Sequence, residues 1–419
     1  MKNFRRGIAA VLSAAMLMTS VGCAETDIIS QEKQIELSFS WWGNDARNKY
    51  TIAAIEEFEE LHPEIKVECK YSEWSGYETR NKVWMISGTE SDVMQINYGW
   101  LDTYSADGEG YLDINTVSNI VDLTNYGQEQ LDYGIKNGKL NAIPIAMNAQ
   151  TVYINQTLYN RYSLEVPTTW DDFFTAAAKM SEDGIYPLSA ASKALWMYLI
   201  TYAEQKQGKA FLTDDGKLNF TANDFSVMID FYKQLIDAKV LPQVEYYERN
   251  NLASEVYAGS VAWVSDASNY FGEAVKNGRN IVAAPYTTLD GENPGEGWYA
   301  KPATMYAISK NTAHPEEAAK LLDFLLNSKE MAIQQGVEKG IPLSKSAQAA
   351  IEKKGLLEGL QYEASQRMDS ANLGKLDPII ETGGMIDDFF SASNDVIYEK
   401  ATLTDASTAL YRKILADYF

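Results

Sequence analysis

The chain has 419 residues, of which 46% are hydrophobic and 22% are charged. It is therefore long enough for two folded domains and has the composition of a soluble globular protein. The formal net charge is −22. So acidic a protein repels nucleic acid backbones and anionic lipid, which argues against nucleic acid as a partner and against a basic membrane-binding patch.

Residues 1–22 have the features of a secretory leader. The segment begins with the basic run MKNFRR and continues with an apolar stretch over residues 8–21. That stretch is shorter than the ~20 apolar residues that a membrane-spanning helix needs. It ends in Ser20-Val21-Gly22-Cys23, small residues before a cysteine, as at leader cleavage sites. We therefore interpret residues 1–22 as a signal peptide.

The run before Cys23 resembles the lipobox of bacterial lipoproteins, although Ser20 stands where leucine is usual. The resemblance implies that Cys23 is lipidated and that the polar residues 23–34 are a tether. The chain would then lie on the outer face of the cell membrane of a Gram-positive bacterium, held through its lipid anchor only. Plain secretion, with Cys23 discarded, is the alternative.

Residues 35–97 alternate between strand and helix patterns. The expected elements are strands at 35–42, 65–71 and 92–97 and helices at 47–61 and 77–87. Such alternation predicts a parallel sheet with helices on both faces. Ligands of such sheets bind beyond the carboxyl ends of the strands. In the second strand, Cys69 shares the apolar face and is expected to be a buried small hydrophobe.

A second region of alternating elements follows residue 160. Thr168 is expected to cap a helix in which Asp171 follows three residues later. The other expected elements are helices near 223–237, 269–277 and 314–327, strands at 261–264 and 280–284, and a nearly all-helical stretch at 344–419. Residues 35–97 and this second region together predict an α/β protein.

Two adjacent tryptophans end the first strand, in the run SFSWWGNDARNK. Side chains alternate between the faces of a strand, so Trp41 shares a face with Leu37 and Phe39 and is expected in the core. Trp42 lies on the opposite face, where packing does not require it. We therefore predict that Trp42 is a stacking surface for a ligand at the carboxyl end of the strand.

Four segments occur in the order found in one protein family: GKLNAIPIAMNAQTVYINQTLYNRY, EVYAGSVAWVSDASNY, YAISKNTAHPEEAAKLLDFLLNSKE and KGIPLSKSA. They resemble the sugar-binding proteins of bacterial ABC importers, the family of maltose-binding protein. The start, WWGNDARN, is similar to members that take plant-type oligosaccharides. Two family features differ, because Asn269-Tyr270 stands where a tryptophan is common and Lys339 stands where an arginine is common.

The resemblance implies two lobes, each a sheet flanked by helices, joined by three hinge crossings. The N-lobe would comprise 35–146 plus about 285–330, and the C-lobe 147–284 plus about 331–419. A neutral plant-type oligosaccharide (manno-, cello- or xylo-) would bind between the lobes by aromatic stacking and hydroxyl hydrogen bonds. Closure would deliver it to the permease subunits of the importer. The resemblance implies a monomer with no cofactor and no metal.

The candidate ligand contacts lie at expected strand ends, in loops and in the crossings. The aromatic candidates are Trp42, Trp74, Tyr77, Trp100, Trp196, Tyr270 and Trp298, and the polar candidates are Asp45, Arg47, Asn97, Asn148, Asp266 and Lys301.

Some of these candidates have a structural alternative. Trp100 and Trp196 also suit a core, Tyr77 also suits a helix surface, and Asp45 and Arg47 also suit the start of a helix. Trp263 is an alternative to Tyr270 as a stacking surface in the C-lobe.

Two other classes of protein are alternatives to an importer component. No HExxH, GxSxG or P-loop motif is present, and the loop DGENPGEG reads as a turn rather than a calcium site. A glycosidase needs only two carboxylates, which 58 acidic residues cannot exclude. A secreted glycoside-active enzyme and a surface lipoprotein without a small ligand therefore remain as alternatives to a non-enzymatic binding protein.

Overall fold

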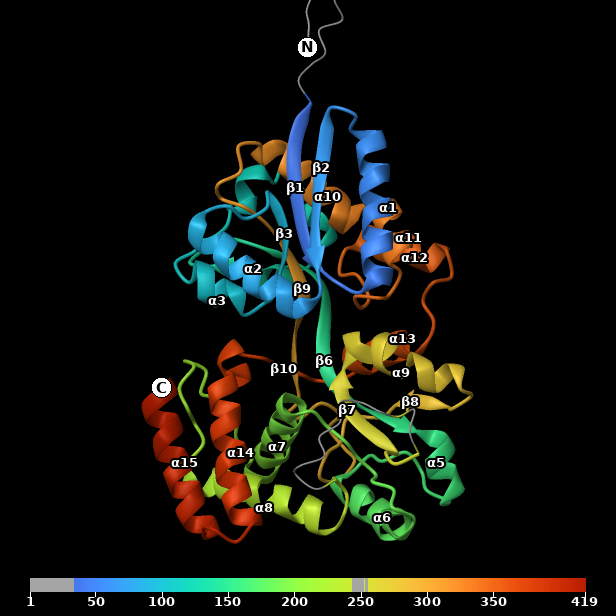
Figure 1. The fold of residues 1–419 in the computed structure, drawn as a ribbon, viewed down its shortest axis with the longest axis vertical. Coiled ribbons are helices and arrows are strands. Elements are labelled where there is room, and N and C mark those ends of the chain that lie inside the picture. Colours follow the sequence, from blue (N-terminus) through green and yellow to red (C-terminus); the bar gives the residue numbers. More distant parts are fainter. Residues whose placement is uncertain (1–33, 243–251, 253–254) are drawn as a thin grey trace, which may run out of the picture.

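The computed structural model describes residues 34–242, 252 and 255–419. Two lobes lie one above the other along the long axis, and two strands, β6 and β9, run between them (Figure 1). The leader, Cys23 and most of the tether lie outside the described residues. Among the described helices, none combines the length and the apolar character needed to cross a membrane.

The N-lobe is built on parallel strands, as the sequence predicts. Strand β1 (Ile35–Trp42) pairs in parallel with β2 (Ile65–Ser72) and β3 (Val93–Ile96). Strand β3 then pairs antiparallel with β9 (Tyr299–Ile308). The remaining N-lobe elements are α1 (Asp45–Leu61), α2 (Trp74–Ser87), α3 (Trp100–Ser105), α4 (Gln128–Leu131), β4 (Ile135–Lys136), β5 (Lys139–Leu140), α10 (Pro315–Asn327), α11 (Lys329–Gln335) and α12 (Lys345–Lys353).

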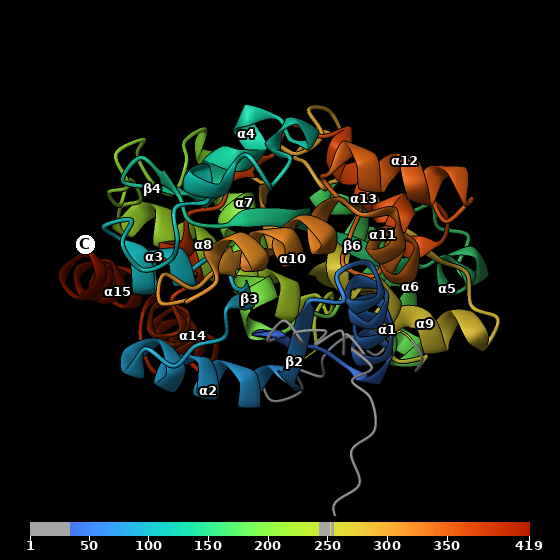
Figure 2. The ribbon, with the colours of Figure 1, turned by 90° about the horizontal axis from the view of Figure 1, so that it is seen from above.

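Helices cover both faces of this sheet. Figure 2, which looks down the long axis, shows α2 and α10 on opposite sides of β3. On the α1 and α10 face, Phe39, Trp41 and Phe58 lie in one buried cluster. On the α2 and α3 face, Tyr77 and Ile96 belong to another. The half-buried Cys69 packs against the first cluster, and burial raises the pKa of its thiol to about 11.

The C-lobe is mainly helical around a short antiparallel sheet. Its elements are α5 (Gln156–Arg161), α6 (Trp170–Met180), α7 (Ser192–Gln207), α8 (Ala222–Asp237), β7 (Gly259–Trp263), α9 (Ala267–Lys276), β8 (Ile281–Ala283), α13 (Leu360–Asp369), β10 (Gly374–Lys375), α14 (Gly383–Ile397) and α15 (Leu403–Tyr418).

The cap of α6 lies one residue later than predicted. Thr169, not Thr168, accepts from the backbone N–H of Asp172, and Asp172 in turn accepts from the N–H of Thr169. This reciprocal pair is a capping box with aspartate in the acidic position. Both threonine–aspartate pairs have the same spacing, so the pattern alone does not choose between them.

The long strand β6 (Ile143–Asn155) joins the two lobes. Residues Ile143 to Ala149 pair with β9, and residues from Gln150 onward pair with β7. The segment 339–343, predicted as the third crossing, lies beside β6, because Pro342 forms a bridge with Ala146 and the N–H of Leu343 donates to Ile145. It is not itself a crossing, because α11 before it and α12 after it both pack in the N-lobe, and the chain passes to the C-lobe only after α12. The three segments that resemble hinge crossings therefore lie side by side.

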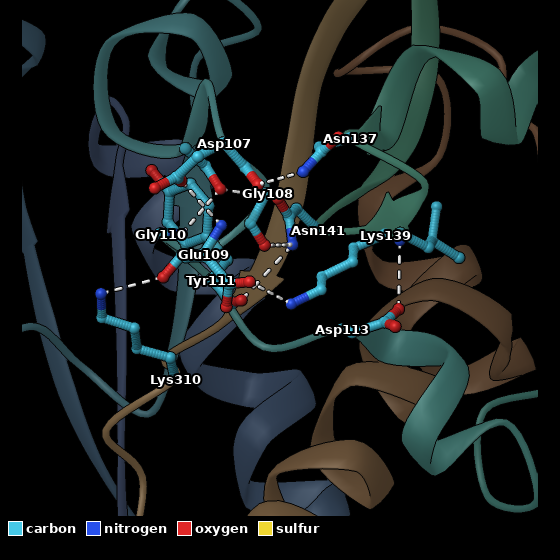
Figure 3. Close-up of polar contacts among 12 residues, drawn as sticks. Asp107, Gly108, Glu109, Gly110, Tyr111, Asp113, Asn137, Lys139, Asn141 and Lys310 are labelled. Carbon is cyan, nitrogen blue, oxygen red and sulfur yellow. Dashed lines mark hydrogen bonds and ion pairs between the residues drawn. The ribbon is translucent and has the colours of Figure 1, made fainter.

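A polar network holds the loop that leads toward β6 (Figure 3). Asn141 donates to the carbonyls of Gly108 and Tyr111 at 3.2 and 3.4 Å, and Lys310 donates to the carbonyl of Glu109 at 2.9 Å. Gly110 permits this packing, because a Cβ atom there would lie 2.0 Å from the carbonyl oxygen of Tyr104. The network fixes the chain two residues before the hinge strand begins.

The lobe boundaries differ from the predicted ones in two places. Residues 285–298, predicted in the N-lobe, lie in the C-lobe, where Tyr286 and Trp298 pack in the same cluster as Trp170. Helices α11 and α12 (residues 329–353), predicted almost wholly in the C-lobe, pack in the N-lobe on α1 and α10. The chain passes from one lobe to the other in the middle of β9 and again after α12. Neither position is the start of one of the segments from which the lobe boundaries were predicted.

Candidate functional site

A cavity of about 440 Å³ lies where the carboxyl ends of β1 and β2 meet the hinge. The N-lobe contributes its wall from two strand ends, β9 and Lys339 form its floor, and Ser265 comes from the C-lobe. The lining residues are Trp42, Gly43, Asn44, Arg47, Glu73, Trp74, Ser265, Ala303, Thr304 and Lys339. Trp42, Arg47 and Trp74 therefore line a cavity at the strand ends, and their contact with a ligand stays a prediction.

Trp41 and Trp42 point to opposite sides of β1. Trp41 is fully buried, and its indole N–H donates to Asn48 at 2.9 Å. Trp42 is half-buried and meets Trp74 edge to face, with ring centroids 4.9 Å apart. Trp42 pairs with Ser72 at the end of β2, which brings Trp74 to the same edge of the sheet. The two indoles thus form one aromatic wall, as the alternation of the strand predicts for Trp42.

Two predicted contacts, Tyr77 and Trp100, support this aromatic wall from behind. Trp100 is 7% exposed and stacks on both Trp74 and Tyr77, with centroid distances of 5.8 and 6.0 Å. Tyr77 is fully buried, and its hydroxyl donates to the carbonyl of Gln95 at 2.8 Å. The prediction of a ligand contact at Tyr77 is wrong, because α2 begins at Trp74 and turns Tyr77 into the core. Trp100 is buried in the core, which was the alternative to a ligand contact.

Trp196 and Trp298 lie in the C-lobe core rather than in the cavity. The indole N–H of Trp196 donates to the carbonyl of Ile380 at 2.8 Å, and that of Trp298 to Thr287 at 3.0 Å. Trp298 packs edge to face against Tyr198 and Tyr286. Both predictions of ligand contact are wrong, since each indole is enclosed and its N–H is satisfied inside the lobe.

A buried ion pair joins the start of α1 to the segment between α11 and α12. Arg47 donates to the carboxylate of Glu338 at 2.8 and 3.1 Å, and the hydroxyl of Tyr50 donates to it at 2.7 Å. The two charged side chains are 12% and 19% exposed. Burial raises the pKa of Glu338, but the Arg47 guanidinium and these hydrogen bonds outweigh it, so the pKa lies below its ordinary value. Glu338 was not predicted from the sequence.

Lys339, beside Glu338, lies at the floor of the cavity. Its side chain is buried, and its ammonium nitrogen donates to the hydroxyl of Tyr306 at 2.8 Å. Burial and the positive charge of Arg47 lower the pKa of Lys339 well below its usual range, against an opposing effect of Glu338. The sequence marked this lysine only as a departure from the usual arginine of the crossing.

Asn148 and Lys301 lie opposite each other on the hinge strands and brace the C-lobe side. Asn148 donates to the hydroxyl of Ser265 at 2.9 Å and accepts from its N–H at 3.0 Å. Lys301 pairs with Glu381, and its ammonium lies 4.4 Å from the ring centroid of Trp263. Neither side chain lines the cavity, so both act as supports of the residues around it in this structure.

Asp45 and Asn97 do not line the cavity either. Asp45 is exposed in the first turn of α1, whose capping residue is Asn44 rather than Asp45. The side-chain oxygen of Asn97 accepts from the N–H of Gly99 at 3.0 Å, closing a turn. The side chains of Asp266 and Tyr270 lie outside the described residues.

A second hollow between the lobes has a volume of about 590 Å³. Tyr98, Asp102 and Lys136 line it from the N-lobe, and residues 210–216 and 374–380 from the C-lobe. None of the predicted contacts whose side chains are described lies in its wall. Within the described part of the chain, no group of His, Cys, Asp and Glu side chains is arranged to hold a metal ion.

Two lobes, adjacent hinge strands and an aromatic and polar cavity beside the hinge define a two-lobed binding protein. The family described as bacterial extracellular solute-binding protein matches residues 42–332, more than half of the chain. The chain therefore belongs to this family, whose members bind solutes and are not enzymes.

Individual relatives agree with this assignment. An uncharacterised ABC transporter extracellular-binding protein of Pyrococcus horikoshii is 22% identical over 408 residues, covering 90% of this chain and 86% of the relative. A periplasmic oligogalacturonide-binding protein of Yersinia enterocolitica, solved with saturated digalacturonic acid, is similar with a TM-score of 0.82 and 29% identity, covering 91% and 98% of the two chains. A periplasmic solute-binding protein of Pectobacterium atrosepticum is similar with a TM-score of 0.85 and 26% sequence identity, and the match covers 91% of this chain and 98% of the other.

Proposed function

We propose that this protein is the substrate-binding component of an ABC importer and captures a plant-type oligosaccharide between its lobes. The observation that carries the proposal is the aromatic wall of Trp42 and Trp74 at the edge of the cavity. Trp74 is 38% exposed although large and apolar. Such a side chain can stack on the C–H face of a sugar ring. The polar groups of Asn44, Ser265 and Thr304, which also line the cavity, can form hydrogen bonds with the hydroxyl groups at the edge of the ring.

The comparisons support an importer and a sugar. The Pyrococcus relative is described as an ABC transporter binding protein, and the Yersinia structure holds an acidic disaccharide. A ligand that contacts both lobes favours the closed form by its differential affinity, and closure is the signal that permease subunits would read. We further propose that the protein acts as a monomer, with no enzymatic step.

Two classes of sugar, neutral and acidic, are candidates for the ligand. The prediction of a neutral oligosaccharide rests on the net charge of −22, which describes the whole surface. Among the described lining residues, the charged ones are Arg47, Lys339 and one acid, Glu73. A panel of ligands must therefore contain manno-, cello- and xylo-oligosaccharides together with oligogalacturonides.

Titration calorimetry and thermal unfolding with this panel test the proposal. A true ligand at 100 times its Kd should raise the free energy of unfolding by ~2.7 kcal/mol, because it binds the native state only. The alternative enzyme would instead release new reducing ends from the same oligosaccharides. If no member of the panel stabilises the protein, the proposed function is wrong.

We also propose that Cys23 is the lipidated first residue of the mature protein. Replacing Cys23 with alanine should move the protein from the membrane fraction to the medium or leave an unprocessed precursor, because the acyl chains provide the anchor. Fractionation and the mass of the N-terminal peptide would check this. A Cys23→Ala variant that is still cleaved and still sediments with membranes would contradict it.

A further inference from the structure

The Lys339 ammonium is a buried cation with few partners. Its residue is 1% exposed, although it lines the cavity. An ammonium group carries three N–H donors. Among the described residues, the hydroxyl of Tyr306 is the one side chain that accepts from it. An ammonium removed from water without full hydrogen bonding is unstable, so such a lysine tends to lose its proton.

The charged groups around Lys339 do not provide a spare counter-ion. From α1 it faces Arg47, from β9 it faces Tyr306, and Glu338 is its neighbour in the chain. The carboxylate of Glu338 already accepts both donors of Arg47 and the hydroxyl of Tyr50. The positive charge of Arg47 and the negative charge of Glu338 largely cancel. The other acid of the cavity, Glu73, is exposed at the end of β2.

We propose that the ligand is a carboxylated sugar whose carboxylate binds beside Lys339, and that Lys339 takes up a proton from solvent as it binds. The inference rests on the proposed function and names the class of its substrate. A carboxylate a few ångströms away favours the charged form of an amine, so binding and protonation stabilise each other. Arg47 is held in its pair with Glu338, which leaves Lys339 to supply the charge. A neutral sugar offers no such coupling.

The test on the unmodified protein is calorimetry with a matched pair of ligands, digalacturonate and its dimethyl ester. Each is titrated in phosphate and in Tris buffer, whose different heats of ionisation reveal the protons exchanged. The carboxylates of digalacturonate stay ionised from about pH 6 to about pH 9, so they contribute no protons there. We expect digalacturonate to bind at least about tenfold more tightly than the ester. Its binding should take up protons, approaching one per complex at the alkaline end, while the ester takes up none.

Two variants locate the effect. Lys339→Met should abolish the proton uptake and reduce the affinity for digalacturonate to that of the ester. Lys345→Met is the matched control, because Lys345 is exposed on the same segment and donates to the carbonyl of Thr124 outside the cavity. If Lys339→Met does not fold, the proton count of the unmodified protein still decides the question.

The outcomes separate this inference from the proposed function. Binding of digalacturonate without proton uptake throughout that pH range overturns the role of Lys339. Binding of neutral oligosaccharides alone overturns the carboxylated class and leaves the importer function intact. A protein that binds no sugar of the panel overturns both.

Discussion

Replacing Trp41 with alanine should lower the free energy of unfolding by about 3–5 kcal/mol, the range for aromatic-to-alanine changes in cores. Trp41 is fully buried, stacks between Phe39 and Tyr71 at centroid distances of 4.9 Å, and donates to Asn48. The change leaves a cavity and an unpaired amide oxygen. Urea unfolding of the unliganded protein would measure it, while the affinity of the molecules that remain folded should change little.

The neighbouring residue is the matched control for this experiment. Trp42→Ala removes an aromatic face of the cavity from a half-buried position, so unfolding should be affected much less. The affinity for an oligosaccharide should fall at least about tenfold, or ~1.4 kcal/mol. If Trp42→Ala is the more destabilised variant and binds normally, the cavity beside β1 is not the ligand site.

Replacing Glu338 with glutamine should destabilise the protein by about 3 kcal/mol, because it leaves the buried Arg47 without its counter-ion. Glutamine has nearly the same shape, so the loss reports the charge rather than a cavity. The pair joins α1 to the segment between α11 and α12, and it holds Arg47 in the wall of the cavity. Affinity for the ligand should therefore fall as well. Urea unfolding and calorimetry on the same preparation would measure both effects.

The pH dependence gives a second readout of the same pair. The pKa of Glu338 in the folded protein lies below its ordinary value, so the carboxylate stabilises the fold at neutral pH. This contribution is complete above about pH 4.5, the ordinary pKa range of glutamate, and is lost as the pH falls through the folded pKa. Glu338→Gln should lack this acid-dependent loss. The exposed Glu352→Gln on α12 is the control and should behave as the unmodified protein.

Local patterns in the sequence determined the N-lobe sheet and the orientation of its aromatic residues. The alternation of strands and helices predicts the parallel pairing of β1, β2 and β3. The period of two within β1 separates Trp41 from Trp42, because neighbouring side chains point to opposite faces of a strand. The position of Trp74 after β2 follows in the same way, since the carboxyl ends of parallel strands meet at one edge. These inferences need only a few consecutive residues.

Tertiary structure alone decided which aromatics are accessible and which charges meet. Trp196 and Trp298 are of a residue type that can stack on a sugar ring. Backbone carbonyls of other segments nevertheless accept their indole N–H groups inside the C-lobe. Arg47 and Glu338 lie 291 positions apart in the chain, and no local period relates them. The amine of Lys339 is buried only because β9 and α1 close around it, and this burial lowers its pKa. Burial and charge depend on segments brought together by packing, and a pattern of near neighbours does not contain that information.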